Sequence, residues 1–510
     1  MFASVPSAVV LGAEGQAVTV EVHVADGLPG FHIVGLPDES VREARDRVRA
    51  AVTSSRIRWP DTKVTVNLAP SHHRKSGAGL DLAIAVGVLA AGGRIPVEAV
   101  RRVAVVGDLG LDGSVRPVVG VAPMVGALDR AGPDGAPDVV VPVASAHEAA
   151  VVATGRVRPV ATLGEVVGAL AGEAPWPDHD LAPPPAPPPA VADLADVRGQ
   201  RLARAALEIA AAGGHHLLLV GPPGAGKTML AARLVGLLPP LDRERALEVT
   251  MIHSAAGVEL PACGLVTRPP FRAPHHTSSE VSIVGGGSGG LRPGEISIAH
   301  GGVLFLDELP EFAPRVIQTL RQPLEEGRVR VARAALHATI PARFQLVAAM
   351  NPCPCGGGEP GACACGERRV ERYAARVSGP LLDRLALRVH VERPSVDALL
   401  DDAPGEPTAL VAERVARARA RSLDRRGALS AELTAAELDE HAPLDAASSG
   451  LLRAELEAGR LSARGYHRVR RVARTIADLA GAEVIEEATV ALALELRAAI
   501  GGRASRRWAP

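Results

Sequence analysis

The residues with the plainest chemical purpose lie between Gly221 and Thr228, in the sequence GPPGAGKT. Its glycines allow the backbone to curl, so that successive N–H groups point at one anion. Lys227 would then reach the β- and γ-phosphates of a nucleotide, and the hydroxyl of Thr228 would hold Mg²⁺. This P-loop motif predicts a site for ATP and Mg²⁺ made of Gly221, Pro222, Pro223, Gly224, Ala225, Gly226, Lys227, Thr228 and Met229.

Acidic and amide side chains further along the chain complete this chemistry. Asp307 and Glu308 follow the apolar run VLFL. Asp307 would share Mg²⁺ with Thr228, and Glu308 would orient and deprotonate the attacking water. Asn351 follows another apolar run and is a candidate for positioning that water, the role called sensor 1. Asparagine at the end of a strand also commonly starts a turn, so both interpretations of Asn351 stay open.

The apolar runs before these residues indicate which elements position them. Residues 217–220, 303–306 and 344–349 are short and continuously apolar, as buried strands are. In open α/β sheets, ligands bind at the carboxyl ends of the strands. A helix restarts at Lys227, and residues 201–212 predict an Ala- and Leu-rich helix directly before the P-loop strand. The sequence therefore predicts an α/β core with a parallel sheet.

Four of the five cysteines are crowded between residues 353 and 365. Thiolates separated by Gly and Pro turns can surround a tetrahedral Zn²⁺, although the common zinc knuckle is CxxC rather than CxC. The four residues form either a structural zinc site, which we favour, or a set of reduced, unliganded thiols. They are Cys353, Cys355, Cys363 and Cys365.

The length and net charge of the chain limit how many domains it has and which partners it attracts. The chain has 510 residues and a formal net charge of −1, which suits about three domains and gives no global attraction for a polyanion. Any nucleic-acid binding must come from local arginine clusters. We find no targeting leader and no apolar run of membrane length, and so expect a soluble, cytoplasmic protein with no membrane partner.

Proline triplets at 183–185 and 187–189 mark a stiff linker over residues 173–195. The linker separates a first domain, residues 1–172, from the P-loop core, residues 196–393, and a helical lid, residues 394–510.

The two flanking domains differ in their periodicity. In the first, alternating runs at 18–24 and 64–68 predict strands, 40–54 predicts an amphipathic helix and 81–91 a buried helix. In the last, residues 409–421, 451–458, 462–479 and 485–500 have helical periodicity, with Ser462 as an N-cap. Arg464, Arg468 and Arg471 share one helix face, which is either solvated, the commoner case, or bound to DNA phosphates.

Two segments of the core are candidates for contacting DNA. Residues 265–300 form an insertion before Asp307 and contain His275 and His276. These histidines are either a weak metal pair or part of a loop facing a pore or a DNA strand, which we favour. Residues 327–341 predict a hairpin. Its basic residues, which either contact phosphates or lie in solvent, are Arg328, Arg330 and Arg333.

The first domain resembles the Lon-protease type in the segments GLPGFHIVGLPDESVREARDRVRAA, VTVNLAPSHHRKSGAGLDLAIA and GDLGLDGSVRPVVG. Lon proteases use a Ser–Lys pair, but Gly79 stands at the serine position and Ala122 at the lysine position. The resemblance therefore implies a Lon-like domain without peptidase activity, with a structural or docking role. Lys75 and Ser76 lie nearby and leave a rewired pair open.

Over nearly its whole length, the chain resembles the magnesium-chelatase-like AAA+ ATPases of the ComM/YifB type. The matching segments include DVRGQRLARAALEIAAAGGHHLLLVGPPGAGKTMLA, PGEISIAHGGVLFLDELPEF, LVAAMNPCPCG, SGPLLDR and LSARGYHRVRRVARTIADLAG. The resemblance implies a hexameric ring ATPase that acts on branched or single-stranded DNA. Its implied activity is that of a helicase promoting branch migration in homologous recombination and natural transformation.

The same resemblance implies roles for two arginines. Arg384 would be an arginine finger reaching the γ-phosphate of the neighbouring subunit, and Arg464 a sensor-2 residue from the lid. Ala386 stands where the family usually has Asp. The alternative function is the ATPase subunit of a metal chelatase, which remodels a protein partner. Those subunits lack a Lon-like first domain, so the resemblance favours the DNA motor.

Overall fold

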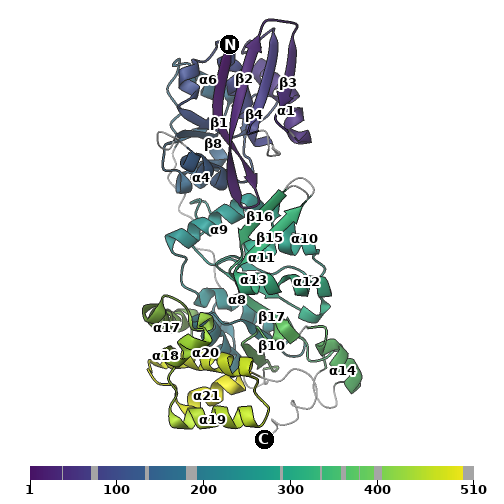
Figure 1. Cartoon of the computed structure of the whole chain (residues 1–510), viewed down its shortest axis with the longest axis vertical. Helices are drawn as coiled ribbons and strands as arrows, with labels where there is room; N and C mark the ends of the chain where they lie inside the picture. The colour runs from purple at the N-terminus through teal and green to yellow at the C-terminus, as the bar shows by residue number, and fades with distance from the viewer. Residues whose placement is uncertain are drawn as a thin grey trace.

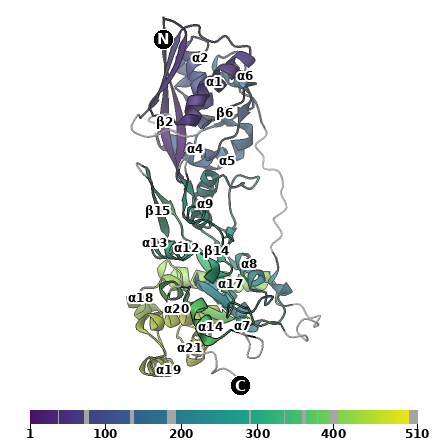
Figure 2. The same ribbon diagram turned by 90° about the vertical axis from the view of Figure 1, so that its right-hand side faces the viewer.

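The computed structural model describes residues 1–36, 38–70, 78–131, 137–179, 192–287, 291–333, 336–357, 363, 365–377, 379–394 and 405–497. In this part of the chain, three bodies follow one another along the long axis: the first domain, the P-loop core and the helical region (Figure 1). The view at a right angle shows the same succession (Figure 2). Residues 180–191 of the predicted linker, together with Lys75 and Ser76, lie outside the described residues.

The described part of the first domain is an α/β unit with two main sheets and one two-stranded sheet. The larger has the order β1-β2-β4-β3, from β1 (Phe2–Leu11), β2 (Glu14–Ala25), β3 (Gly30–Val34) and β4 (Lys63–Ala69). In it, only β3 and β4 pair in parallel. The smaller, parallel sheet contains β5 (Val103–Val105), β8 (Asp138–Pro142) and β9 (Val157–Val160). A short antiparallel pair joins β6 (Asp108–Leu109) and β7 (Val115–Arg116).

Helices cover these sheets: α1 (Glu39–Ser54), α2 (Asp81–Ala91), α3 (Val97–Val100), α4 (Val121–Ala131), α5 (Ala146–Val152) and α6 (Leu163–Leu170). Every residue of α2 is buried, and the helix packs against β1 and β2. This confirms the burial predicted from its apolar sequence. The strands and helices predicted for the first domain are all present.

The core contains a five-stranded sheet, parallel throughout, in the order β11-β14-β17-β10-β18. Its strands are β11 (Phe271–Arg272), β14 (Val303–Leu306), β17 (Gln345–Met350), β10 (Leu217–Val220) and β18 (Leu387–His390). All residues of β10, β14 and β17 are buried, as expected for a parallel sheet covered on both faces. Because β17 lies between β10 and β14, the carboxyl ends of these three strands meet at one edge.

One sequence-based prediction is corrected here. Residues 265–300 are not wholly an insertion, because β11 within them pairs with β14 and forms the edge of the core sheet. A strand this short carries no periodicity from which a sequence could predict it. The rest of the segment contains α10 (Glu280–Val284), α11 (Glu295–Ile298) and the pair β12 (Gly285–Gly286) and β13 (Arg292–Pro293).

The other core helices surround the sheet: α7 (Arg201–Gly213), α8 (Lys227–Leu237), α9 (Arg243–Ala256), α12 (Pro314–Thr319), α13 (Arg321–Glu326), α14 (Glu367–Ala374) and α15 (Gly379–Leu382). The predicted hairpin is confirmed, since β15 (Arg328–Arg333) pairs antiparallel with β16 (Leu336–Pro341). Its β16 strand lies against the β1–β2 turn, where a Cβ on Gly12 would be 2.8 Å from that of Ala338. The first domain therefore rests directly on the hairpin (Figure 1).

The C-terminal region is helical, with α17 (Thr408–Arg426), α18 (Ala435–His441), α19 (Ala446–Glu457), α20 (Ala463–Ala480) and α21 (Glu487–Glu495). Ser462 accepts a hydrogen bond from the Gly465 N–H and is the predicted N-cap. The sequence did not predict α18, and α21 is shorter than the range 485–500. Across the described ranges, no helix combines the length and apolar character that crossing a bilayer requires.

The prediction of a solvated arginine face on α20 is wrong for two of its three members. Arg464 is 80% exposed. Arg468 is only 16% exposed, and Arg471 donates to the carbonyl of Leu433 at 2.6 Å. The inner part of this face packs within the helical region, so only Arg464 remains in solvent.

Candidate nucleotide site

The P-loop connects β10 to α8 and has the backbone that its glycines predict. Gly224 and Gly226 take positive φ angles of 77° and 86°, which glycine adopts without steric cost. Gly221 approaches β18 so closely that a Cβ there would lie 2.1 Å from the carbonyl oxygen of Val391. The predicted residues from Gly221 to Met229 thus form one loop and the first turn of a helix, whose N–H groups suit a phosphate chain.

Lys227 is the cation of this loop. Its Nζ donates to the carbonyls of Gly221 at 2.7 Å and Pro222 at 2.9 Å, and to Oδ1 of Asn351 at 3.1 Å. Burial lowers the pKa of Lys227 below its usual value, against the opposing fields of Asp307 and Glu308. The ammonium group is therefore close to the predicted sensor, and the sheet order explains why: β17, which ends at Met350, lies beside β10.

The predicted magnesium ligands are also together. The Thr228 hydroxyl donates to Oδ2 of Asp307 at 2.7 Å, so two oxygen ligands of the kind Mg²⁺ prefers face each other. The residue after Asp307 takes an unusual backbone conformation: Glu308 has φ 51°, and its N–H donates to Oδ1 of Asp307 at 2.9 Å. This turn presents the Glu308 carboxylate, 51% exposed, beside the ligand pair.

A histidine that the sequence analysis did not place at the nucleotide site also reaches this carboxylate. Nδ1 of His276 lies 3.2 Å from Oε2 of Glu308, and its ring packs on that of His275 with centroids 4.2 Å apart. The sequence offered these histidines as a metal pair or a loop. The structure brings His276 to the candidate catalytic base, because β11 and β14 are parallel neighbours whose following loops emerge at the same edge. Had β11 been recognised in the sequence as a neighbour of β14, it would have predicted that His276 lies near Glu308.

The four cysteines converge at the end of β17. Their sulfur atoms all lie within 4.8 Å of one another. The Cys353 sulfur is 3.3 Å from that of Cys355 and 3.4 Å from that of Cys363. Hydrogen bonds, first from the backbone of Gly357, lower the pKa of Cys355 to about 6, which favours the thiolate form that binds metals. The cluster fits a tetrahedral metal with sulfur ligands.

The two predicted arginines lie in a different cluster. Arg384 is paired with Glu325 and donates to the Pro380 carbonyl at 2.6 Å. Arg464 lies 3.7 Å from Asp383, which Arg468 also approaches at 3.8 Å. Burial, followed by the neighbouring arginines, lowers the pKa of Arg384. In the hydrogen bonds and ion pairs of the described residues, Arg384 contacts Glu325 and the Pro380 carbonyl, and Arg464 contacts Asp383. Neither arginine contacts Lys227 there.

Arg384 has an acidic partner although Ala386 stands where the family usually has Asp. Ala386 is 7% exposed, and the carboxylate that pairs with Arg384 comes instead from α13.

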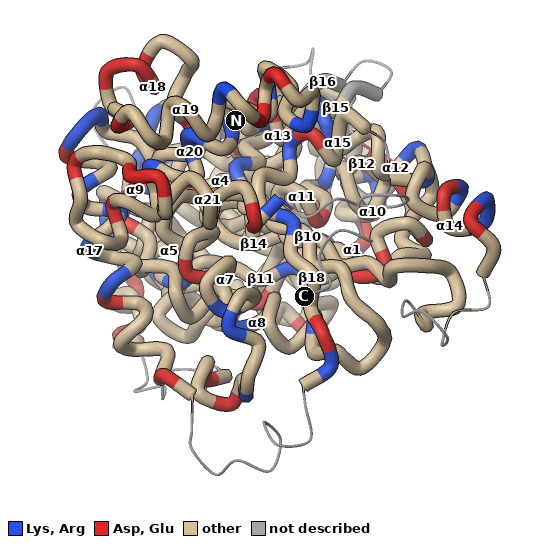
Figure 3. The backbone as a smooth tube through the Cα atoms, turned by 90° about the horizontal axis from the view of Figure 1, so that it is seen from below, with Lys and Arg blue, Asp and Glu red and all other residues tan. Residues whose placement is uncertain are grey.

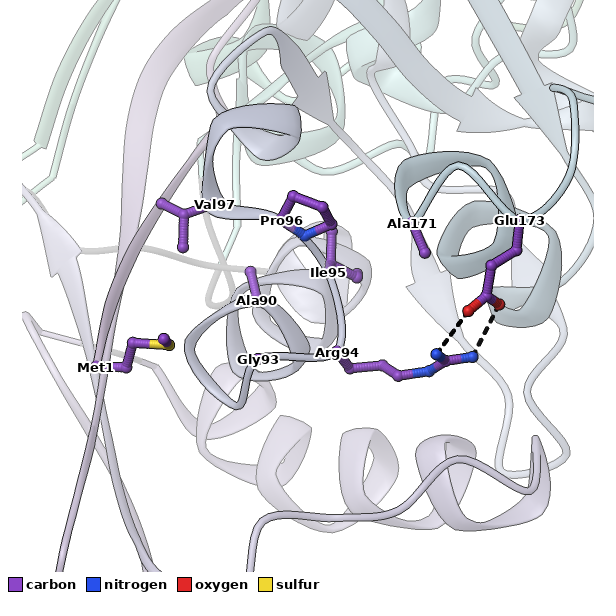
Figure 4. Close-up of a pocket in the computed structure, with 9 residues that line it drawn as sticks. All are labelled: Met1, Ala90, Gly93, Arg94, Ile95, Pro96, Val97, Ala171 and Glu173. Atoms are coloured by element: carbon purple, nitrogen blue, oxygen red, sulfur yellow. Dashed lines mark hydrogen bonds and ion pairs between the residues drawn. The ribbon is translucent and has the colours of Figure 1, made fainter.

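Two cavities were compared with the positions of these residues. The lining of one cavity includes Gly199 and Arg201; Gln200, which lies between them in the sequence, donates from its amide to the carbonyl of Ala225 in the P-loop at 3.4 Å. That cavity is lined by Leu194, Val197, Arg198, Gly199, Arg201, Arg204, Ala205, Glu208, Gly405, Glu406 and Val411. The other lies in the first domain, where Arg94 and Glu173 join across it by hydrogen bonds of 2.7 and 2.9 Å (Figure 4). The pair satisfies both charges of that hollow, which is far from the P-loop.

Ala122, which the sequence analysis compared with the lysine position of Lon proteases, lies at a contact between two parts of the chain. The Ala122 N–H donates to Oε1 of Glu148 at 2.8 Å and to the Ser254 hydroxyl at 3.3 Å. Ser254 also donates to Glu148, and burial raises the pKa of this carboxyl. Since α4 packs against α9, this position lies in the contact between the first domain and the core.

A parallel sheet with the P-loop strand beside a polar-tipped strand, and an acidic pair on the next, defines a P-loop ATPase of the AAA+ class. Family descriptions match along the chain: "Magnesium chelatase, subunit ChlI" over residues 193–399, "Subunit ChlI of Mg-chelatase" over 20–145, and "Magnesium chelatase, subunit ChlI C-terminal" over 405–497.

Relatives match over almost the full chain. An uncharacterised protein of Mycobacterium tuberculosis, Rv2897c, is 46% identical over 495 residues, covering 96% of this chain and 97% of that protein. The competence protein ComM of Haemophilus influenzae is 41% identical over 498 residues, 96% of both chains. The uncharacterised protein YifB of Escherichia coli is 40% identical over 494 residues, 96% of this chain and 95% of that protein. The chain therefore belongs to the magnesium-chelatase-like AAA+ ATPases, in the ComM/YifB family.

Proposed function

We propose that this protein is an ATP-driven ring motor that acts on DNA as a helicase, promoting branch migration in homologous recombination and natural transformation. The assembled set of Lys227, Thr228, Asp307 and Asn351 supports the ATPase part. The DNA part is supported by the relative named a competence protein, similar over 96% of both chains. We place the protein in the cytoplasm, where its DNA would be.

In the proposed reaction, the P-loop holds the phosphates and Lys227 leaves its carbonyl partners for them. Bound Mg²⁺ would supply charge neutralisation between the phosphates, and Thr228 and Asp307 are the residues that would hold it. Glu308 accepts the proton of the attacking water, and Asn351 orients that water. The cavity lined by Gly199 and Arg201, on either side of Gln200 in the sequence, is the proposed place for the nucleotide base.

The proposed ring has six subunits, and each ATP site is completed by the next chain. Arg384 and Arg464 contact neither Lys227 nor Asp307 in the hydrogen bonds and ion pairs of the described residues. Instead, Arg464 lies near Asp383 and Arg384 is paired with Glu325, and Arg464 is close enough to Arg384 to help lower its pKa. A cluster of guanidinium groups on a separate face suits the γ-phosphate of a neighbouring subunit, where charge develops during phosphoryl transfer.

The hairpin β15–β16 is the proposed DNA contact. Arg328 and Arg330 are 52% and 59% exposed, and both approach Glu326; the side chain of Arg333 lies outside the described set. Seen from the helical end, basic and acidic residues are interspersed over the molecule (Figure 3). Because positions of both signs alternate along the described backbone there, we propose a local basic cluster, that of the hairpin, as the DNA contact.

We further propose Zn²⁺ as a structural cofactor at the four cysteines, and a Lon-like first domain that docks rather than cleaves. The second candidate function is a chelatase-like or protein-remodelling ATPase, which the family description of the core favours. The two candidates differ in whether ATP turnover and binding respond to DNA.

The test measures binding to forked and duplex DNA over a range of salt concentrations, with ATP turnover in the same samples. Replacing Arg328 and Arg330 by Ala should lower the slope of log affinity against log salt by about 1.4 to 1.8, since each phosphate contact contributes about 0.7 to 0.9. Replacing Arg58 and Arg101 by Ala, exposed arginines of the first domain, is the matched control. Turnover indifferent to all DNA, with no salt-dependent binding, would refute the DNA motor and favour protein remodelling.

A further inference from the structure

The cysteine cluster is built into the segment that carries the predicted sensor. Asn351 follows β17, and Cys353 comes two residues later with only 2% of its surface exposed. Asn351 also accepts the 3.1 Å hydrogen bond from Lys227. Only Pro352 separates Cys353 from Asn351. A shift of Cys353 therefore moves Asn351, and with it the hydrogen-bond partner of Lys227.

The chain returns to Asn351 after leaving the cluster. Helix α14 begins at Glu367, two residues after Cys365, and carries Tyr373, which is 5% exposed. The backbone of Asn351 faces the Tyr373 hydroxyl and opposes the rise that burial causes in its pKa. Both ends of the cysteine segment are thus close to Asn351, one through the chain and the other through the buried side chain of Tyr373.

A third contact joins the cluster to the P-loop itself. Gly356 follows Cys355 with φ 77°, and its N–H donates to the carbonyl of Cys353 at 3.0 Å. A Cβ on Gly356 would lie 2.8 Å from both Cγ and Cδ of Pro223. The cysteine loop therefore packs against the phosphate-binding loop at a distance that only glycine allows.

A cross-link between the cysteines would hold these contacts in place. Residues 351–357 contain no helix or strand, and the sulfur–sulfur distances of 3.3 to 3.6 Å are not disulfide bonds. A tetrahedral Zn²⁺ with Zn–S bonds of about 2.3 Å places its sulfur ligands about 3.8 Å apart. Small shifts of the four side chains therefore satisfy a zinc ion, whose binding free energy becomes folding free energy of the loop.

We infer that zinc held by Cys353, Cys355, Cys363 and Cys365 fixes Asn351 and the P-loop in the arrangement for hydrolysis, so that metal occupancy sets the rate of ATP turnover. The inference rests on the proposed ATPase and deepens it. Without the metal, the loop loses its cross-link and Asn351 loses its support. The phosphate contacts from Gly224 to Thr228 remain, so ATP binding persists while the positioning of the water fails.

The experiment compares the wild-type chain with Cys353→Ser and Cys355→Ser, purified with reductant and without chelator. Cys263→Ser is the matched control, because Cys263 is exposed and lies outside the cluster. Zinc content, ATP affinity and kcat are measured on each sample. We expect about one zinc per chain in wild type and control, its loss in both variants, a kcat at least about tenfold lower, and an ATP affinity changed by less than about threefold.

Tyr373→Phe tests the coupling where the metal remains, since it removes only the hydroxyl. It should keep its zinc and lower kcat several-fold at nearly unchanged ATP affinity. Zinc-free variants that hydrolyse ATP at the wild-type rate would overturn the coupling while leaving the ATPase intact. Wild-type protein that hydrolyses ATP without zinc, or with iron in its place, would overturn the metal assignment. Wild-type protein with zinc and no ATP turnover would instead count against the proposed function.

Discussion

The two histidines before the P-loop strand predict a pH-dependent loss of stability in the core. Nε2 of His215, 1% exposed, lies 2.7 Å from the Thr475 hydroxyl on α20. Nδ1 of His216 accepts from the Leu346 N–H at 3.0 Å. Burial lowers the pKa of His215 to about 3 and that of His216 to about 4. Both rings are therefore neutral in the folded core.

The sign follows from these lowered values. A histidine whose pKa falls on folding contributes stability above its unfolded pKa, near 6.5, and loses that contribution as the pH falls toward the folded value. Each pH unit below 6.5 costs about 1.4 kcal/mol per histidine. At pH 5, still above both folded pKa values, the loss is about 2 kcal/mol for each and about 4 kcal/mol for the pair.

Hydrogen exchange of the β10 amides at pH 7.5 and pH 5 measures this effect as an opening free energy, without requiring the whole chain to unfold in one step. His215→Gln and His216→Asn keep a polar group near each hydrogen bond and do not titrate. In the double variant, the drop in opening free energy between pH 7.5 and pH 5 should be about 4 kcal/mol smaller than in the wild type. In each single variant it should be about 2 kcal/mol smaller. His390→Asn, at an exposed position, is the control. An unchanged pH dependence in the double variant would refute the reasoning.

The remaining predictions concern the ATP site and the first domain. Glu308→Gln should bind ATP but turn it over at least about tenfold more slowly, since a general base contributes that or more; Lys227→Ala should weaken nucleotide binding in a fluorescence titration. His276→Ala should raise basal turnover by up to about fivefold, because the exposed contact between its ring and the Glu308 carboxylate, worth at most about 1 kcal/mol, no longer restrains Glu308; unchanged turnover would exclude that restraint. Mixing inactive Arg384→Ala with inactive Lys227→Ala should restore some activity if sites are shared between chains, whereas full hydrolysis by a dilute monomer would contradict the shared site. Casein should survive incubation with protein and ATP, because the Lon-type positions carry no nucleophile–base pair; cleavage would show that the site was wrongly aligned.

Much of the ATP site follows from the sequence because its chemistry is local. The P-loop is one continuous stretch, and its glycines are required by positive φ angles at Gly224 and Gly226. The acidic pair after VLFL and the asparagine after β17 are recognised from short apolar runs that end in polar residues. The continuous apolar pattern of α2 predicts its burial in the same way, and Ser462 predicts the start of α20.

Only the tertiary structure decided how separate segments meet. The strand order puts β17 between β10 and β14, and no local pattern in these strands encodes which neighbours they take. β11 was missed because a two-residue strand is held by pairing rather than by propensity, and with it the approach of His276 to Glu308. The partners of the arginines on α20 could not be predicted from the sequence either. The burial of a long charged side chain depends on carbonyl groups that distant segments supply, as Leu433 does for Arg471.

The cysteine segment shows both sources of information at once. Its composition was sufficient to predict a metal site, because four cysteines within so short a stretch of a chain with only five are a chemical signal in themselves. Its attachment to Asn351 through Tyr373, and to Pro223 through Gly356, required the folded chain. Residue type sets which bonds a side chain is able to make, whereas packing over long sequence separations sets which of those bonds form.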